Sequence, residues 1–351
     1  MSKRVFFIGG GAVGAYTGGH MARAGVDVTL VDPWKEHVEK MRTEGLELRG
    51  VTPEETCTVK LKAMTPEEFQ AIAKDKPVDI GIVSTKSYDT EWAVNLLVPA
   101  LADDAFVVSL QNCINEDRIA AIVGKDRVAG CIASTISVEL KAPGFVERSV
   151  PKRGDSYTVF RCGEYTGKES DRVRELVEWL KNVDSAKMTT NLMGERWSKL
   201  VINASHNGLS ACTGYGSRDM AVLEKPRRLS IKLSGETIKV AKALGIELEN
   251  IKGFTPDEWV AAADGDAETL ARIEKTTIDS AQGRSSTGRP SMGQDIAKGR
   301  RTEIDYLNGL VVEKGKELGI PTPANEGIVA AVKLVESGKA PQDPKHIDGL
   351  V

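Results

Sequence analysis

Three glycines near the start of the chain restrict its fold more than any other feature. Gly9, Gly11 and Gly14 form the spacing G-x-G-x-x-G, which closes the strand-like run RVFFIGG and opens a helix expected over residues 12–24. In this setting the first glycine permits a tight turn, the second lets the backbone approach a pyrophosphate, and the third lets helix and strand pack closely. The pattern predicts a dinucleotide-binding α/β domain. A glycine-rich turn with a purely structural role is the alternative.

The carboxyl end of the second expected strand indicates which dinucleotide binds. This strand ends at Asp32, where an acidic side chain accepts hydrogen bonds from the adenosine ribose hydroxyls. A 2′-phosphate there would meet a carboxylate, at a cost of about 1 kcal/mol or more, so Asp32 favours NAD over NADP. Two alternatives stay open: Asp32 caps the helix that begins near Pro33, and Lys35 lies close enough to bind a phosphate. The residues expected along the cofactor's pyrophosphate are Gly9, Gly10, Gly11, Ala12, Val13 and Gly14.

Strand and helix patterns alternate through the first half of the chain. Buried-type strands are expected at residues 26–32, 78–86 and 106–112, with helices between them, which predicts a parallel sheet with right-handed crossovers. Mixed strands continue to about residue 164 and are expected to extend this sheet. From about Leu192 the strand patterns fade and helical periodicity dominates.

The expected fold class is therefore α/β, with a Rossmann-type doubly wound sheet followed by an all-helical C-terminal domain. We place the dinucleotide-binding domain at residues 1–190 and the helical substrate and catalytic domain at 191–340. A tail at 341–351 is expected to lie loosely on the surface. The length of 351 residues agrees with two domains.

Composition narrows the function classes. The net charge of −3 gives no electrostatic reason to expect nucleic acid or an anionic membrane as a partner, and no apolar run approaches the roughly 18 residues of a membrane span. The five cysteines are scattered without a C-x-x-C pair, which favours reduced thiols and a cytoplasmic location. With four histidines and no clustered His/Cys set, no metal site is expected.

A polar stripe marks the helix expected over residues 197–214. Lys199, Asn203 and Asn207 recur at every fourth position, with Ser210 on the same stripe, while nearly all other residues are apolar or small. A solvated helix face would carry more charge, so we expect the helix to be buried. Because unpaired buried polar groups cost roughly 1–3 kcal/mol each, the stripe is expected to face a cavity; a purely structural hydrogen-bond network is the alternative.

A second group of polar residues lies at residues 289–309. Ser291 precedes an expected helix in which Glu303 stands among the apolar residues Ile304, Tyr306 and Leu307. From the residues alone, Ser291 is equally well a helix N-cap, and Glu303 is equally well a surface carboxylate.

These motifs together resemble the ketopantoate reductase family, the 2-dehydropantoate 2-reductases. The resemblance runs in family order from residue 6 to about residue 326. Its most specific parts are the K-x-x-x-N-x-x-x-N stripe and the segment PSMGQDIAKGRRTEIDYLNG. The matching segments are IGGGAVG, VSTKSYDT, SLQNCINED, WSKLVINASHNGLSA, PSMGQDIAKGRRTEIDYLNG and GIPTPAN.

The resemblance implies roles for the residues of both polar groups. Lys199 matches the family's general acid, which binds the substrate and protonates its carbonyl oxygen, a role that typically contributes 10²–10⁴-fold to the rate. Asn203, Asn207 and Ser291 match positions that hold substrate oxygens. Glu303 matches a carboxylate on the nicotinamide-ribose side of the cofactor.

Two further cofactor contacts are implied in the first domain, and five departures from the family pattern stand out. Lys86 and Asn112 match cofactor contacts, and Asn112 also matches a substrate contact. Asp32 and Pro33 stand where members that use NADPH commonly carry an arginine. The other departures are Gly293 in place of a bulky residue, Cys113 in place of glycine, His206 at an apolar position, and a longer segment at 254–287.

The function implied is a cytoplasmic, NAD-dependent reductase or dehydrogenase that interconverts a 2-oxo acid and a 2-hydroxy acid. The leading reaction is 2-dehydropantoate to pantoate, as in pantothenate biosynthesis. One alternative is a dehydrogenase of the same scaffold that acts on another, bulkier hydroxy compound. A second is a non-catalytic dinucleotide sensor, for which Lys199 would have no use. The expected partner is a small-molecule substrate, and the resemblance leaves a homodimer open.

Overall fold

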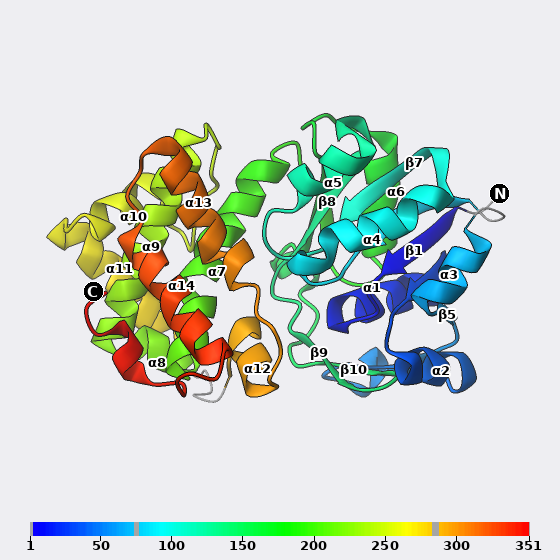
Figure 1. Ribbon diagram of the computed structural model, residues 1–351, viewed down its shortest axis with the longest axis horizontal. Helices are drawn as coiled ribbons and strands as arrows, with labels where there is room; N and C mark the ends of the chain where they lie inside the picture. Colours follow the sequence, from blue (N-terminus) through cyan, green and yellow to red (C-terminus); the bar gives the residue numbers. More distant parts are fainter. Residues whose placement is uncertain (1–2, 74–76, 283–287, 351) are drawn as a thin grey trace. The chain divides into compact units, whose positions relative to one another are not determined.

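The computed structural model of the protein describes residues 3–73, 77–282 and 288–350. By internal packing the chain divides into two compact units, Met1–Leu192 and Met193–Val351. The first unit is a mixed α/β domain and the second is helical (Figure 1). This architecture confirms the fold class expected from the sequence.

The first unit is built around an eight-stranded sheet. The six neighbouring strands β8, β7, β6, β1, β2 and β5 run parallel to one another. At the other end of the sheet, β11 pairs antiparallel with β8, and β12 pairs parallel with β11. In spatial order the strands are β12 (Ala186–Met188), β11 (Phe160–Glu164), β8 (Val128–Ala133), β7 (Leu101–Ser109), β6 (Val78–Val83), β1 (Arg4–Ile8), β2 (Asp27–Val31) and β5 (Lys62–Met64).

Helices cover both faces of this sheet, and β1 shows why. Successive residues of a strand point to opposite faces: Val5 and Phe7 belong to one hydrophobic cluster, while Phe6 and Ile8 belong to another. The first cluster is completed by α1 (Ala12–Arg23), α2 (Lys35–Thr43) and α6 (Asp171–Leu180), and the second by α3 (Pro66–Ile72), α4 (Thr90–Leu97) and α5 (Glu116–Val123). A sheet that is buried on both faces explains the apolar strands of the sequence.

A second, four-stranded sheet departs from the expectation that all later strands extend the first. Its strands in order are β4 (Cys57–Val59), β3 (Leu46–Arg49), β10 (Phe145–Arg148) and β9 (Val138–Ala142). The expectation is correct for β8 and β11 but wrong for β9. Glu139 and Lys141 alternate with apolar residues in β9, which suits a sheet with one solvated face, and Gly144 with φ 68° closes its hairpin with β10.

In the described part of the second unit the regular secondary structure is helical, apart from one isolated bridge between Ile251 and Phe254. The apolar periodicity at residues 256–281 is divided at Gly265 (φ 99°) into two helices. Trp259, in the longer segment that departs from the family pattern, lies in the core and donates a hydrogen bond to the Ile251 carbonyl. The helices are α7 (Leu192–Thr213), α8 (Ser217–Val222), α9 (Glu224–Ala243), α10 (Pro256–Ala263), α11 (Ala267–Ser280), α12 (Ser291–Ala297), α13 (Asn308–Leu318) and α14 (Pro323–Glu336).

Short 3₁₀ helices complete the described secondary structure, and one of them corrects the expectation of a loose tail. Ile347 is 1% exposed, and the Asp343 N–H donates to the Cys212 carbonyl of α7 at 3.0 Å. The tail is therefore held to the helical unit. The 3₁₀ helices are η1 (Pro53–Glu55), η2 (Ser87–Asp89), η3 (Val98–Ala100), η4 (Lys125–Arg127), η5 (Gly154–Ser156), η6 (Ile304–Tyr306) and η7 (Pro344–Ile347).

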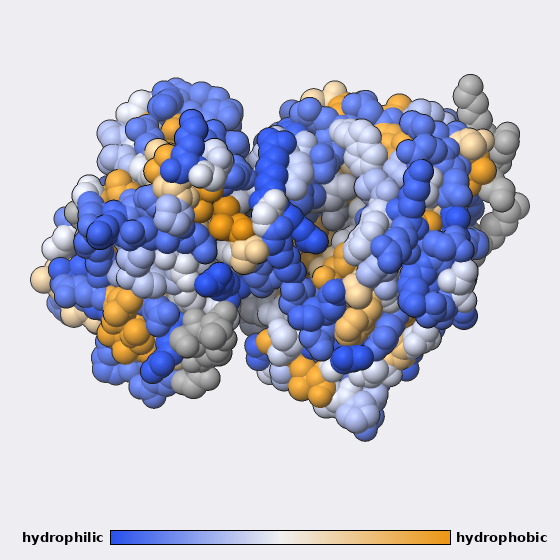
Figure 2. Space-filling model, turned by 60° about the horizontal axis from the view of Figure 1, so that its bottom comes forward, coloured by the Kyte–Doolittle hydropathy of each residue, from blue (hydrophilic) through white to orange (hydrophobic). Residues whose placement is uncertain are grey.

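Hydrophilic side chains predominate on the face drawn in Figure 2, and hydrophobic ones form small separate groups. Among the described residues, no helix combines the length and the apolar character that crossing a bilayer requires. All five cysteines are free thiols.

Candidate functional site

The glycine turn between β1 and α1 has the geometry that its spacing predicts. Gly9 has φ 104°, and a Cβ there would lie 2.8 Å from the Thr85 nitrogen; a Cβ at Gly14 would lie 2.2 Å from the Gly9 oxygen. Both positions therefore exclude a side chain. A Cβ at Gly11 would meet nothing within 4 Å, so the first turn of α1 opens at Gly11 onto space where its unpaired N–H groups are available to an anion.

Asp32 has a second function in addition to the one expected for it. Its Oδ2 accepts a hydrogen bond from the Gly10 N–H at 2.7 Å, and its Oδ1 accepts one from the Trp34 N–H at 2.9 Å. The N-cap of α2 is Trp34, so the alternative that Asp32 caps this helix is wrong. Two bonds leave part of the carboxylate's acceptor capacity for ribose hydroxyls.

His37 of α2 is hydrogen-bonded to the glycine turn, a contact that the sequence did not predict. Its Nδ1 lies 2.8 Å from the Gly144 nitrogen and its Nε2 lies 2.9 Å from the Gly10 oxygen. Because the Gly144 N–H only donates, Nδ1 is the acceptor and the proton is on Nε2, which donates to Gly10. The ring is fully buried.

Lys86 and Asn112 lie in the loops after β6 and β7. These strands are parallel to β1 and β2, so both loops lie at the sheet edge that carries the glycine turn and Asp32, where α/β sheets bind ligands. Both side chains are half-buried. The Gln111 amide ties the two loops together by donating to the Thr85 carbonyl at 3.1 Å and to Thr90 Oγ1 at 2.9 Å.

Cys113, next to Asn112, has an unusual backbone conformation. Its φ is 65°, a left-handed conformation that costs a residue with a side chain roughly 1–2 kcal/mol. Its side chain is buried. The resemblance places a glycine here, so this chain tolerates strain that glycine would avoid.

Glycine at position 113 should therefore be the more stable of two matched replacements. Cys113→Gly and Cys113→Ala both remove the thiol, but only alanine keeps the strained Cβ. Denaturant unfolding should give Cys113→Gly a free energy of unfolding about 1 kcal/mol above that of Cys113→Ala. Equal stability, or a more stable alanine variant, would contradict the strain.

The polar stripe of α7 separates into an accessible part and a structural end. Lys199 and Asn203 are half-buried, and Asn207 is 6% exposed. Ser210 is fully buried, and its Oγ donates to the Tyr215 carbonyl at 2.7 Å. Ser210 thus fastens the chain at the end of α7, which leaves Lys199, Asn203 and Asn207 as the candidate functional groups.

Most of the rest of α7 is buried, as expected. Leu200, Ala204 and Leu209 beside the stripe are inaccessible, whereas Ile202 is 37% exposed. His206, which departs from the family pattern, places its Nδ1 3.0 Å from the Ile202 carbonyl oxygen, within hydrogen-bond distance. The burial excludes a solvated helix.

The second polar group lies against α7 within the same unit. A Cβ at Gly293 would lie 2.6 Å from Ser210 Oγ, and a Cβ at Gly208 would lie 3.2 Å from both Ile304 and Asn308. Gly293 therefore leaves no hole where the family has a bulky residue, because the Ser210 hydroxyl already occupies that space.

The structure decides the two alternatives for Ser291 and Glu303. Ser291 is the first residue of α12, whose N-cap is Pro290 without a side-chain bond, and Ser291 is exposed. Glu303 is 5% exposed. The interpretations as an N-cap and as a surface carboxylate are therefore wrong.

A buried network of amide and carboxylate side chains is hydrogen-bonded to the backbone of α7, and the sequence did not predict it. Asn308 Nδ2 donates to the Ala204 carbonyl at 2.9 Å and to Asn325 Oδ1 at 2.8 Å. Asn325 Nδ2 donates to Glu236 Oε2 at 2.8 Å. Glu236 also accepts the Ala324 and Asn325 backbone N–H groups, so it binds the N-terminus of α14. The network connects α9, α13 and α14 to the backbone next to Asn203.

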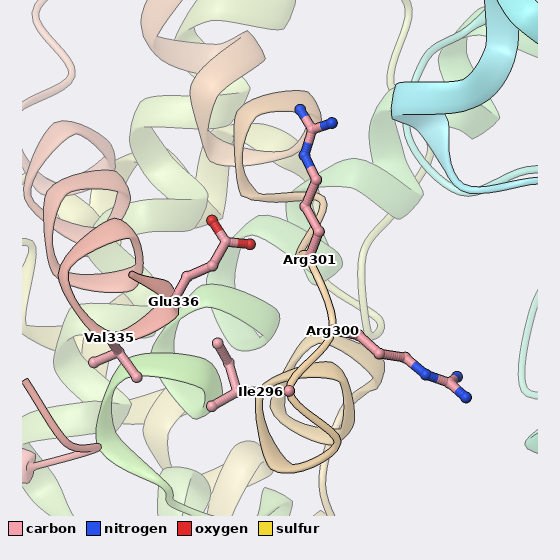
Figure 3. A pocket seen from close by; sticks show the side chains of 6 residues that line it. Ile296, Arg300, Arg301, Val335 and Glu336 are labelled. Atoms are coloured by element: carbon pink, nitrogen blue, oxygen red, sulfur yellow. The ribbon is translucent and has the colours of Figure 1, made fainter. Parts of the chain in front are cut away.

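A pocket of about 350 Å³ in the second unit is separate from these residues. In Figure 3 the Arg300 and Arg301 side chains point in different directions and away from the Glu336 carboxylate, which accepts the Thr302 N–H. No convergent set of donors forms, and no expected site residue lines the pocket. Its lining residues are Ile296, Gly299, Arg300, Arg301, Val335 and Glu336.

Comparison with known proteins matches both units. A family model described as Ketopantoate reductase PanE/ApbA matches residues 5–156, and one described as Ketopantoate reductase PanE/ApbA C terminal matches residues 191–336. A 2-dehydropantoate 2-reductase of Pyrococcus horikoshii is 30% identical over 336 residues, which cover 95% of this chain and 98% of that protein.

Solved structures share the fold over nearly the whole chain. A PanE/ApbA family ketopantoate reductase from Ralstonia eutropha JMP134 has a TM-score of 0.76 and 29% identity, covering 96% of this chain and 99% of the other. A ternary structure of D-mandelate dehydrogenase with NADH and anilino(oxo)acetate has a TM-score of 0.77, covering 95% and 98%. At 24% identity, this second likeness concerns the fold.

Proposed function

The chain belongs to the ketopantoate reductase family, and from this premise we propose that it is an NADH-dependent oxidoreductase that reduces a 2-oxo acid to a 2-hydroxy acid. The leading substrate is 2-dehydropantoate. The observation that carries the proposal is the stripe of Lys199, Asn203 and Asn207 on a helix that is otherwise largely buried. An ammonium and two amides along one line provide a proton donor and hydrogen-bond partners for a small oxygen-rich molecule.

The residues after β1 and β2 fit a dinucleotide. Gly11 leaves open space at the N-terminus of α1, which suits a pyrophosphate, and the Asp32 carboxylate retains capacity for ribose hydroxyls. The nicotinamide of the bound cofactor supplies the hydride. Lys86, Asn112 and Glu303 are proposed to hold the cofactor, as the family resemblance implies.

The chain's own contribution is a proton and a fixed position for the substrate. Lys199 donates a proton to the carbonyl oxygen as that oxygen gains negative charge, and its positive charge stabilises the same oxygen. Asn203, Asn207, Ser291 and Asn112 hold the remaining substrate oxygens. Since Ser210 is already bonded to Tyr215, we assign it no contact with substrate.

Cofactor choice provides the first functional prediction. NADH should exceed NADPH in kcat/KM by at least about tenfold, or about 1.4 kcal/mol, because the Asp32 carboxylate repels a 2′-phosphate. Asp32→Asn should narrow this ratio, since it removes the charge and keeps one oxygen for the Gly10 N–H. Asp32→Ala should narrow the ratio too, with a larger loss of affinity for both cofactors. Steady-state kinetics with each cofactor measure the ratio, and equal use of both by the parent protein would remove Asp32 as the discriminator.

A substrate panel tests the proposed reaction. With NADH, the parent protein should reduce 2-dehydropantoate with the highest kcat/KM, ahead of small 2-oxo acids and of an aromatic 2-oxo acid such as phenylglyoxylate. The aromatic compound is included because D-mandelate dehydrogenase shares the fold. A preference for it would favour a dehydrogenase of a bulkier hydroxy acid, and binding of NADH without turnover of any compound would favour a sensor.

A further inference from the structure

The backbone N–H and carbonyl groups of Gly9 and Gly10 are all hydrogen-bonded to other segments of the first unit. The Gly9 N–H donates to the Val31 carbonyl at 2.8 Å, and the Gly9 carbonyl accepts from Ser84 Oγ at 2.7 Å. The Gly10 N–H is bound by Asp32, and the Gly10 carbonyl by His37. Three of these four partners lie at the ends of neighbouring strands, whereas His37 is in α2.

The bond from His37 determines the direction of the next N–H group. The peptide unit between Gly10 and Gly11 is planar and trans, because the structure contains no cis peptide bond among its described residues. In a trans peptide the carbonyl and the following N–H point in opposite directions. With the Gly10 carbonyl directed at His37, the Gly11 N–H points away from the ring, at the residue where a side chain would meet open space.

His37 itself is rigidly held, which makes it suitable for this task. The Gly144 N–H donates to its Nδ1, so the proton stays on the nitrogen that faces Gly10. Gly144 lies in the β9–β10 hairpin with φ 68°, and the exposed Trp34 ring stacks on the imidazole at a centroid distance of 5.6 Å. The ring therefore has one tautomer and little freedom to turn.

We propose that His37 is a positioning residue of the cofactor site, which orients the Gly10–Gly11 peptide so that the Gly11 N–H binds the pyrophosphate of the dinucleotide. Donation into the Gly10 carbonyl also polarises the shared peptide and strengthens the Gly11 N–H as a donor. The proposal rests on the dinucleotide part of the proposed function and is independent of the substrate.

Calorimetric binding of NADH and ADP-ribose tests this role. His37→Phe keeps a buried ring but removes both hydrogen bonds, and it should raise the Kd of both ligands about tenfold or more, because both carry the pyrophosphate. At saturating NADH its kcat should remain within about twofold of the parent value, since His37 acts through the turn. His37→Gln carries an amide NH₂ that can donate and a carbonyl oxygen that can accept, and it should restore at least part of the affinity.

His20→Phe is the matched control. His20 is a buried histidine of the same unit, packed against Tyr16 at a centroid distance of 4.6 Å, and burial lowers its pKa to about 3. It contacts none of the turn residues through a bond that the structure shows, so this variant should bind NADH as the parent does.

Three results would overturn the inference. His37→Phe that binds NADH and ADP-ribose with parental affinity would remove the role directly. If His37→Phe and His37→Gln lost the same affinity for NADH and ADP-ribose and the same amount of Tm, His37 would be a structural residue only. If His20→Phe weakened NADH binding as much as His37→Phe does, the effect would not be specific to His37. If the parent protein binds neither ligand, the dinucleotide part of the proposed function fails as well, which calorimetry of the parent shows separately.

Discussion

Lys199→Ala should lower kcat for reduction of the preferred 2-oxo acid at least 100-fold, while the Kd of NADH changes less than about twofold. A positioned general acid typically contributes 10²–10⁴-fold, and alanine leaves the developing oxyanion without a proton donor. Lys199 lies in the second unit, whereas the glycine turn lies in the first, so the two effects should separate.

Two kinds of control distinguish chemistry from folding. Asn203→Ala and Asn207→Ala should act mainly by raising KM for the 2-oxo acid, with losses in kcat smaller than that of Lys199→Ala. Ser210→Ala removes the bond to the Tyr215 carbonyl and should reduce stability by about 1 kcal/mol without lowering kcat. If the stripe were only a structural network, Lys199→Ala would resemble Ser210→Ala, with reduced Tm and preserved turnover per folded molecule.

Gly11→Val should weaken NADH binding at least about 100-fold, equivalent to about 2.7 kcal/mol, without loss of folding. A Cβ at Gly11 meets nothing within 4 Å, so the valine side chain starts in open space and occupies the space proposed for the pyrophosphate. Calorimetry gives the Kd, and thermal unfolding gives the matched stability.

Gly14→Val is the contrasting variant for the same turn. Its Cβ would overlap the Gly9 oxygen at 2.2 Å and the Ser84 hydroxyl at 2.5 Å, so this change should destabilise the first unit itself. Parental NADH affinity in a folded Gly11→Val would place the pyrophosphate elsewhere.

The sequence was most informative where local pattern and tertiary structure agree. The glycine spacing and the alternation of apolar strands with helices predicted the doubly wound sheet, because each pattern reflects a local requirement of that fold. The small sheet was not predicted, since β9 pairs with β10 and β10 pairs with the distant β3. The tail was predicted wrongly because Ile347, its buried anchor, stands between polar residues on both sides, where local pattern gives no sign of burial.

The candidate site was predictable only in part, for physical reasons. The periodicity of α7 identified Lys199, Asn203 and Asn207 as one polar stripe, but their roles come from the family resemblance. His37 left no signal, because it reads as a core residue of an amphipathic helix, and Gly144 is 107 positions away. Glu236 was missed likewise, since its partner Asn325 lies 89 positions further along.

A single-turnover experiment on the parent protein tests whether bound NADH reduces a 2-oxo acid with Lys199 as the proton donor. The preformed complex with NADH is mixed with excess 2-dehydropantoate, and the loss of NADH is followed together with the formation of pantoate. We expect each protein molecule to consume its one bound NADH and to form one pantoate, and we expect conversion by Lys199→Ala to be at least 100-fold slower. Stable NADH in the parent complex with 2-dehydropantoate and with every other 2-oxo acid, or conversion by Lys199→Ala at the parental rate, would contradict this expectation.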